Sequence, residues 1–351
     1  MRYLFAILAL GLLVAFHELG HLLAARAFRI KVLRYSVGFG PAIFTFRRGQ
    51  TEYTLGAIPL GGFVRIQGMN PHEEGARTND PASFAAKRPG QRLLVLLAGS
   101  FFNYLLAIVV LIGLHLAGTH MPVPMTIGAI EPGSAAALAQ LRPGDRVAAV
   151  EGEPIEQWSR LVERVNDSPG KDLRLTLGRE GEKLEVTVQP REENGVGRLG
   201  IAQQYVFRRL ALGEAVSASF GHAHRLMAEG LRLLWRLLSG KGGVQLTSPI
   251  GVVKAASDAA STGLDAFLRV LVSISIALAV FNLLPVPALD GGRAAFVAVE
   301  AATGRKVSPK VETLLHTLGF VLLIALIFYI AAQDVRRLVA SPPPPPSGRG
   351  P

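Results

Sequence analysis

Cysteine is absent from all 351 residues of the chain. This absence excludes disulfides, cysteine nucleophiles and thiolate metal ligands, so a metal site here must use nitrogen and oxygen donors. Acidic residues are also scarce, with 26 Asp and Glu against 37 Lys and Arg, which gives a net charge of +11. The positive charge is spread along the chain rather than gathered in one tract. This pattern argues against nucleic-acid binding and fits contact with an anionic lipid bilayer.

Long apolar runs are abundant, since half of the residues are hydrophobic. About 20 helical residues cover the hydrocarbon core of a bilayer. The sequence therefore predicts a polytopic α-helical membrane protein with four transmembrane helices, at residues 1–28, 92–118, 266–289 and 313–333. We expect the first run to be retained and not removed as a signal peptide, because charged and imidazole side chains interrupt it and no small-residue cleavage site follows.

The first apolar run contains His17-Glu18-Leu19-Gly20-His21. On a helix the two histidines lie one turn apart on one face, where they can hold one zinc ion, and Glu18 can act on a water beside it. The alternative is a core helix of a soluble protein whose histidines have ordinary partners. Ionisable groups at membrane depth are costly and usually functional, so we favour the metal site.

A third ligand is expected at the end of the third apolar run, in Asn282-Leu283-Leu284-Pro285-Val286-Pro287-Ala288-Leu289-Asp290. Pro285 and Pro287 must break the helix, and irregular backbone at membrane depth is tolerated where it is buried in protein or lines a wet cavity. Two histidines and the carboxylate of Asp290 complete a zinc site of one ion per chain with a free fourth position. The alternative is that Asp290 merely caps the helix that follows.

The second apolar run has Gly99, Asn103 and Ala107 at intervals of four, hence on one helical stripe. Small residues on such a stripe allow close helix contact. For Gly99 and Ala107 we favour this packing role. For Asn103 packing and a functional contact are both open.

Residues 29–91 form a cytoplasmic loop with β-type sequence. The Gly61-Gly62 pair within it is a hairpin signal, and the segment is too apolar for a free loop. We expect a membrane-associated β-hairpin that offers its edge to an extended peptide by strand addition. The alternative is a small sheet packed on itself.

Residues 122–191 differ in composition from the apolar runs around them. They contain the segments Pro132-Gly133-Ser134-Ala135-Ala136, Leu141-Arg142-Pro143-Gly144-Asp145 and Gly152-Glu153-Pro154-Ile155. This pattern resembles one bacterial PDZ domain, a β-rich module that binds extended peptides between a strand and a helix. We expect amphipathic membrane-surface helices at 206–264, because no window there is free of charge. Residues 290–312 form a cytoplasmic segment and 341–351 a disordered proline-rich tail.

These motifs together resemble the site-2 protease family of intramembrane zinc metalloproteases, in its bacterial regulator-of-sigma-E protease branch. The likeness runs from Met1 to about residue 338, although Leu111 stands where a small or polar residue is frequent. The resemblance implies His17, His21 and Asp290 as zinc ligands and Glu18 as the base. It also implies that Asn282 helps to hold substrate. By position we add Pro285, Pro287, Gly61, Gly62 and Asn103 to the expected substrate-binding residues.

The expected function is hydrolysis of a peptide bond in or near the transmembrane segment of a single-span substrate, such as an anti-sigma factor or a signal-peptide remnant. The alternatives are a catalytically silent PDZ-bearing membrane scaffold and a metal transporter; the intact Glu18 argues against the first, and the scarcity of polar residues along the other spans argues against the second. Basic residues follow the first span and not its start, so the N-terminus and the PDZ domain are predicted outside. The zinc site then lies towards the cytoplasmic side of a bacterial inner membrane. Expected partners are the lipid bilayer, single-span substrates and a peptide or substrate ectodomain at the PDZ domain, with no nucleic acid.

Overall fold

A computed structural model describes residues 2–70, 80–193, 195–239, 247–305 and 307–340 of the chain. The described residues fall into two compact units. The spanning unit comprises Met1–Gly113, Val216–Arg232 and Leu246–Pro351, and the second unit comprises Leu114–Ala215 and Leu233–Gln245. The proline-rich tail predicted at 341–351 lies outside the described residues.

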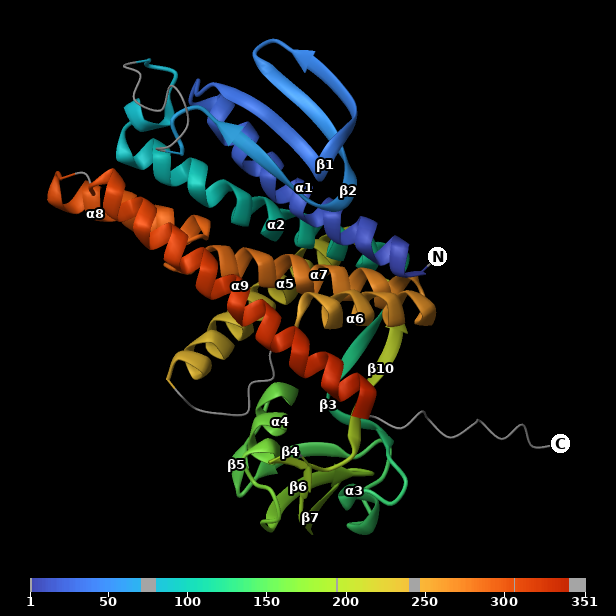
Figure 1. Ribbon diagram of the computed structural model, residues 1–351. Coiled ribbons are helices and arrows are strands. Elements are labelled where there is room, and N and C mark those ends of the chain that lie inside the picture. Colours follow the sequence, from blue (N-terminus) through green and yellow to red (C-terminus); the bar gives the residue numbers. More distant parts are fainter. Residues whose placement is uncertain (1, 71–79, 194, 240–246, 306, 341–351) are drawn as a thin grey trace. The chain divides into compact units, whose positions relative to one another are not determined.

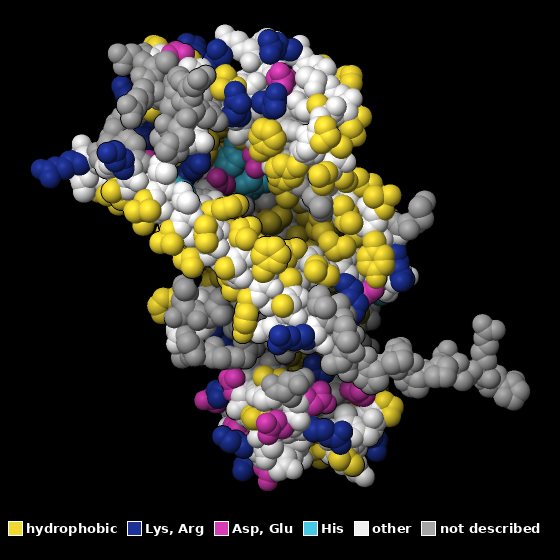
Figure 2. Space-filling model, in the orientation of Figure 1, with side chains coloured by type: hydrophobic (Ala, Val, Ile, Leu, Met, Phe, Trp, Pro, Cys, Tyr) yellow, Lys and Arg dark blue, Asp and Glu magenta, His cyan; other side chains and the backbone are white. Residues whose placement is uncertain are grey.

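Four helices of the described chain are long and apolar enough to cross a membrane. They are α1 (Arg2–Ala27), α2 (Pro89–Ala117), α7 (Leu264–Asn282) and α9 (Pro309–Ala340) (Figure 1). Large apolar side chains on them point outward, among them Leu12, Phe101 and Phe328. In Figure 2 hydrophobic side chains gather over these helices. Such a surface is unfavourable in water and is solvated by lipid, so the expected polytopic membrane protein is confirmed.

Three further helices of eight residues or more belong wholly or partly to the spanning unit: α5 (Leu212–Leu238), α6 (Pro249–Thr262) and α8 (Asp290–Thr303). Neither α5 nor α6 is among the four candidate spans. Ser248 caps α6 by accepting a hydrogen bond from the backbone N–H of Gly251. The third span is shorter than predicted: α7 ends at Asn282, and residues 283–289 are irregular, because the two prolines there cannot continue a helix.

The β-sheet of the spanning unit consists of β1 (Val32–Arg48) and β2 (Thr51–Ile66), which α1 supports. The turn between β1 and β2 lies at residues 49–50, and both glycines lie inside β2 rather than at the tip of a two-stranded hairpin. The chain direction nevertheless reverses between residues 55 and 62, because 34–37 pair with 52–55 in the same order and with 62–65 in the reverse order. Gly61 has φ +92°, so the strand bends there, and Gly62 lies against the carbonyl oxygen of Ser36. The bend brings residues 62–65 beside 34–37, whose other side faces 52–55.

Close approach of α1 and α2 fixes the core of the spanning unit. A Cβ on Gly20 would meet the backbone of Ala98, so only glycine lets the two helices approach so closely. Around this crossing lies a buried apolar cluster drawn from α1, α2, α8 and the sheet, which includes Leu22, Ile66, Leu96 and Val297. The crossing matters for the site because Gly20 lies between the two histidines of α1.

The second unit holds the expected PDZ domain, Thr119–Arg208. Its sheet has the order β10-β3-β4-β6-β7, with β5 (Glu153–Pro154) beside β4. Its elements are β3 (Thr119–Ile130), α3 (Ala135–Leu138), β4 (Arg146–Val150), α4 (Trp158–Asn166), β6 (Leu173–Arg179), β7 (Glu182–Val188), β8 (Arg191–Glu193), β9 (Val196–Arg198) and β10 (Ile201–Arg208). A groove of about 720 Å³ lies between α4 and residues 129–131 and 196–202.

The PDZ domain is longer than its predicted bounds of 122–191. Strand β10 pairs with β3 along its length, with Arg208 opposite Thr119. Residues 206–208, which were expected to begin an amphipathic helix, therefore belong to the sheet, and α5 begins at Leu212. The pattern of residues 201–208 is too short and too polar to separate a closing strand from a helix start.

Candidate metal centre

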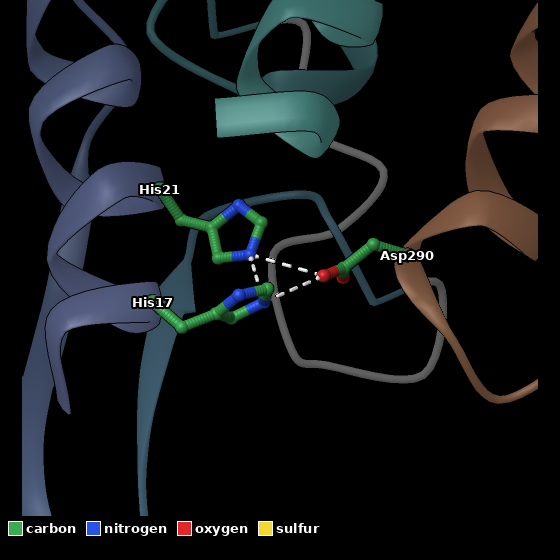
Figure 3. Close-up of side chains that lie close together, drawn as sticks. All are labelled: His17, His21 and Asp290. Atoms are coloured by element: carbon green, nitrogen blue, oxygen red, sulfur yellow. Dashed lines mark hydrogen bonds and ion pairs between the residues drawn. The ribbon is translucent and has the colours of Figure 1, made fainter. Parts of the chain in front are cut away.

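His17 and His21 lie one turn apart on α1, and both are buried. The first residue of α8, Asp290, projects its carboxylate between them (Figure 3). Its Oδ2 lies 3.0 Å from Nε2 of His17 and 3.1 Å from Nε2 of His21, and the two Nε2 atoms are 3.2 Å apart. Three possible ligand atoms therefore converge on one point from two helices far apart in the sequence.

The three donors fit a zinc ion. Donors bound to zinc at about 2.0–2.1 Å in tetrahedral geometry lie about 3.3 Å from one another, close to the observed separations. Two imidazoles and one carboxylate are also the donor types that zinc takes in hydrolytic enzymes. Three protein ligands leave a fourth position for water or substrate.

The structure shows no capping hydrogen bond by Asp290, although a helix cap was the alternative role expected for it. The N-cap residue of α8 is Leu289, and no side chain makes a capping hydrogen bond there. The carboxylate of Asp290 faces the two imidazoles instead, with Oδ2 at 3.0 Å and 3.1 Å from their Nε2 atoms.

Gly99 on α2 makes room for the centre. A Cβ placed there would lie 2.6 Å from Nε2 of His17 and still nearer to Nε2 of His21, among the ligand atoms. Sequence reasoning assigned this glycine to helix packing and missed its place at the site. The four-residue stripe it shares with Asn103 was the signal available, because that stripe faces α1.

The outer nitrogen of each imidazole has a partner that orients the ring. Nδ1 of His21 donates to the carbonyl oxygen of Val95 at 2.8 Å, which leaves Nε2 free to bind a metal. Nδ1 of His17 lies 3.4 Å from the side-chain nitrogen of Asn103, whose Oδ1 is buried without a partner among the described residues. Turning the amide over lets Oδ1 accept from the Nδ1–H group of His17, which again frees Nε2.

Glu18 lies next to His17 and contacts the sheet. Its Oε2 accepts a hydrogen bond of 2.9 Å from the backbone N–H of Val64 in β2. One turn earlier, the hydroxyl of Tyr35 donates to the carbonyl oxygen of Ala15 at 2.8 Å. One turn before that, Gly11 lies against the carbonyl oxygen of Pro59. A single stripe of α1 thus contacts the sheet as far as Glu18, and two turns later the guanidinium of Arg26 donates to the Thr51 hydroxyl.

The other residues predicted to bind substrate lie in three segments. Gly61 and Gly62 precede Val64 on the same strand. Asn282 is half-buried at the end of α7, and Pro285 and Pro287 lie in the irregular segment that leads to Asp290. Asn103 is fully buried against His17, so its side chain contacts a candidate ligand.

Known proteins match almost the whole length of this chain. The profile of peptidase family M50 matches residues 5–326. The chain is 29% identical to the zinc metalloprotease RasP of Geobacillus kaustophilus, over 94% of this chain and 97% of that protein. It is 28% identical to the zinc metalloprotease RasP of Bacillus licheniformis, over 95% and 98%. Among solved structures, the PDZ domain of the SdrC-like protein Lin2157 from Listeria innocua matches 23% of this chain and 94% of its own, at 13% identity and a TM-score of 0.22.

Proposed function

Since the chain belongs to peptidase family M50, we propose that it is an intramembrane zinc endopeptidase that cuts single-span membrane proteins in or near their transmembrane segment. The observation that carries this proposal is the convergence of His17, His21 and Asp290 between helices that are apolar enough to span a bilayer. A donor set of this kind has little reason to exist at membrane depth unless it holds a metal.

Zinc bound at this centre supplies a Lewis acid, which polarises a scissile carbonyl and lowers the pKa of a water. Glu18 is the general base in our proposal. Its Oε2 is held by the Val64 N–H group, so Oε1 takes the proton from the attacking water and later gives it to the leaving amine nitrogen. The silent-scaffold alternative gives no reason for a carboxylate held in this way beside the histidines.

The substrate is an extended peptide in this proposal, because a helical backbone uses its own carbonyls in hydrogen bonds. Residues 62–65 form an edge of the sheet: one side pairs with 34–37, and the other turns towards α1, where Val64 meets Glu18. A peptide added to this edge would run past the metal centre, with Gly61 and Gly62 allowing close backbone approach.

The physiological substrates we propose are an anti-sigma factor or a signal-peptide remnant in a bacterial inner membrane. The charge bias of the loops supports an external N-terminus and PDZ domain, with the centre towards the cytoplasm. The PDZ domain then cannot present the scissile bond. We propose that it filters substrates by the size of their external part, and the competing role is recruitment through its peptide groove.

The test is metal analysis and cleavage by the purified full-length protein in lipid nanodiscs. One zinc per chain and cleavage of a single-span substrate that stops on chelation and returns with zinc are the expected results. Cleavage that persists after the metal has been removed would refute the proposal. Full zinc occupancy without cleavage of any membrane substrate would favour the silent scaffold.

A further inference from the structure

The segment that delivers Asp290 to the metal centre has an unfavourable backbone conformation. Residues 283–289 join α7 to α8 without helical structure, and Pro285 and Pro287 within them have no N–H to donate. Ala288, two residues before Asp290, has φ +81°. A non-glycine residue in this region is strained and persists where its surroundings hold it in place.

Helix α9 contacts this segment and holds its backbone in place. Nδ1 of His316 accepts a hydrogen bond of 2.9 Å from the backbone N–H of Ala288. The same ring packs edge-on against Phe296 of α8, with ring centres 5.6 Å apart. One turn along α9, Gly319 lies against Pro287, and a Cβ there would come within 2.6 Å of the proline Cβ. Two points of α9 thus fix the backbone of the segment just before Asp290.

The contact also fixes the chemical form of His316. Because Nδ1 accepts a hydrogen bond, it carries no proton, and the neutral ring has its hydrogen on Nε2. Nε2 is buried and has no hydrogen-bond partner among the described residues. The polar contact that the described structure gives this half-buried imidazole is therefore the one to Ala288.

We propose that His316 is a positioning residue for the metal centre: by accepting from Ala288 it sets the place of the Asp290 carboxylate relative to His17 and His21. This inference rests on the proposed function. It goes beyond it by assigning to the fourth spanning helix, which contributes no candidate ligand, a part in the coordination geometry. The competing explanation is plain packing of α9 against the segment, which needs the bulk of the ring but not its acceptor.

Two substitutions separate these explanations. His316→Leu keeps an apolar side chain of similar reach against Phe296 and removes the acceptor. His316→Asn loses bulk and places an oxygen acceptor near the position of Nδ1. His224→Leu on α5 is the matched control, because it makes the same chemical change at an exposed histidine.

The experiment uses the full-length protein in nanodiscs with cobalt in place of zinc, since cobalt absorption bands report coordination geometry without turnover. We expect His316→Leu to shift the bands, to weaken metal binding about 10–100-fold in chelator competition, and to lower kcat with little change in KM. His316→Asn should recover most of the wild-type spectrum, and His224→Leu should match wild type. Equal effects of the Leu and Asn variants, or a wild-type spectrum for His316→Leu, would overturn the inference.

Gly319→Ala makes an independent test should His316→Leu not fold. It pushes on Pro287 while the imidazole stays intact, so it should shift the cobalt bands in the same direction, and an unaltered spectrum would contradict the proposed role of α9. The two proposals fail differently. Absence of metal binding in wild type would overturn the proposed function and this inference with it, whereas normal metal and activity in all three variants would overturn this inference alone.

Discussion

Oδ2 of Asp290 lies 3.1 Å from Nε2 of His21, although 269 residues separate them in the chain. The contact joins the first spanning helix to the helix that follows the third. The candidate ligands come together only when both of these helices are in place. Loss of either partner should therefore affect metal binding before it affects the remainder of the fold.

Replacement of Asp290 tests this directly. Asp290→Ala removes one of three ligands, so zinc affinity should fall by more than the 10–100-fold typical of losing a residue that only orients a ligand. Loss of a helix cap would instead cost about 1 kcal/mol of stability and leave the metal bound. Zinc content by mass spectrometry and the melting temperature distinguish the two. Full zinc occupancy in this variant would show that Asp290 is not a ligand.

Glu18→Gln should separate chemistry from metal binding. The amide keeps an oxygen that can accept from Val64, but it cannot take a proton, so cleavage should fall about 100- to 10,000-fold with zinc retained. Cleavage of a single-span substrate and zinc content are measured on the same preparation. Cleavage near the wild-type rate at full zinc content would remove Glu18 from the mechanism.

Gly99→Ala should disrupt the centre although it adds a single methyl group. The new Cβ would lie among the ligand nitrogens of His17 and His21, so the rings must shift and zinc binding should fall at least 10-fold. Gly113→Ala on the same helix is the matched control, because a Cβ there meets nothing within 4 Å. If both variants bind zinc equally well, the space beside the histidines is not needed for the metal.

Acid should destabilise the PDZ domain through Asp145. Burial raises the pKa of this carboxyl, but hydrogen bonds from Arg179 at 2.7 Å and from the backbone of Arg142 outweigh it and hold the pKa below its ordinary value. The folded state thus binds its proton less readily than the unfolded state. The stability that this group contributes is complete above the unfolded pKa, near 4, and is lost as pH falls through the folded pKa.

Urea unfolding followed by the fluorescence of Trp158, in a Trp235→Phe background, measures this effect in the full-length chain. Asp145→Asn should lower the free energy of unfolding at neutral pH, because it removes the charged partner of Arg179. It should also flatten the stability profile below pH 4. An Asn variant with the wild-type acid profile would assign the acid sensitivity to other groups.

Excision of the PDZ domain distinguishes a filter from a docking module. Thr119 and Arg208 are register partners, about 5 Å apart, so a two-residue linker can replace residues 120–207 and keep both ends in place. A filter predicts that substrates with a bulky external domain are now cut at least 10-fold faster. Docking predicts slower cleavage of both bulky and trimmed substrates, and Val162→Arg in the groove should then reproduce the loss.

Much of this architecture can be predicted from local sequence patterns. Hydropathy is enough to predict the four spans, and helical periodicity is enough to bring His17 and His21 to one face. Pro285 and Pro287 predict that α7 ends before them, because proline cannot continue a helix. His17, His21 and Asp290 lie together in the structure, while their role as zinc ligands, like that of Glu18 as base, stays a prediction.

Other features depend on which surfaces meet, and the sequence does not state that. Gly99 belongs to the site because Gly20 lets α1 and α2 approach closely, and neither glycine differs in sequence from one that serves helix packing. Gly61-Gly62 looks like the turn of a hairpin, yet the segments before and after it do not pair with each other, because residues 34–37 lie between 52–55 and 62–65. Strand β10 is recognised as a strand through its partner β3.

The donor set of the centre has a consequence for oxidative stress. Zinc held by thiolates is released when the sulfur is oxidised, and many redox sensors use this reaction. The candidate ligands here are two imidazoles and a carboxylate, and no cysteine exists anywhere in the chain to exchange with them. Peroxide or disulfide stress therefore has no sulfur through which to empty this centre, so a cell can keep the protease loaded while its thiolate zinc proteins lose their metal.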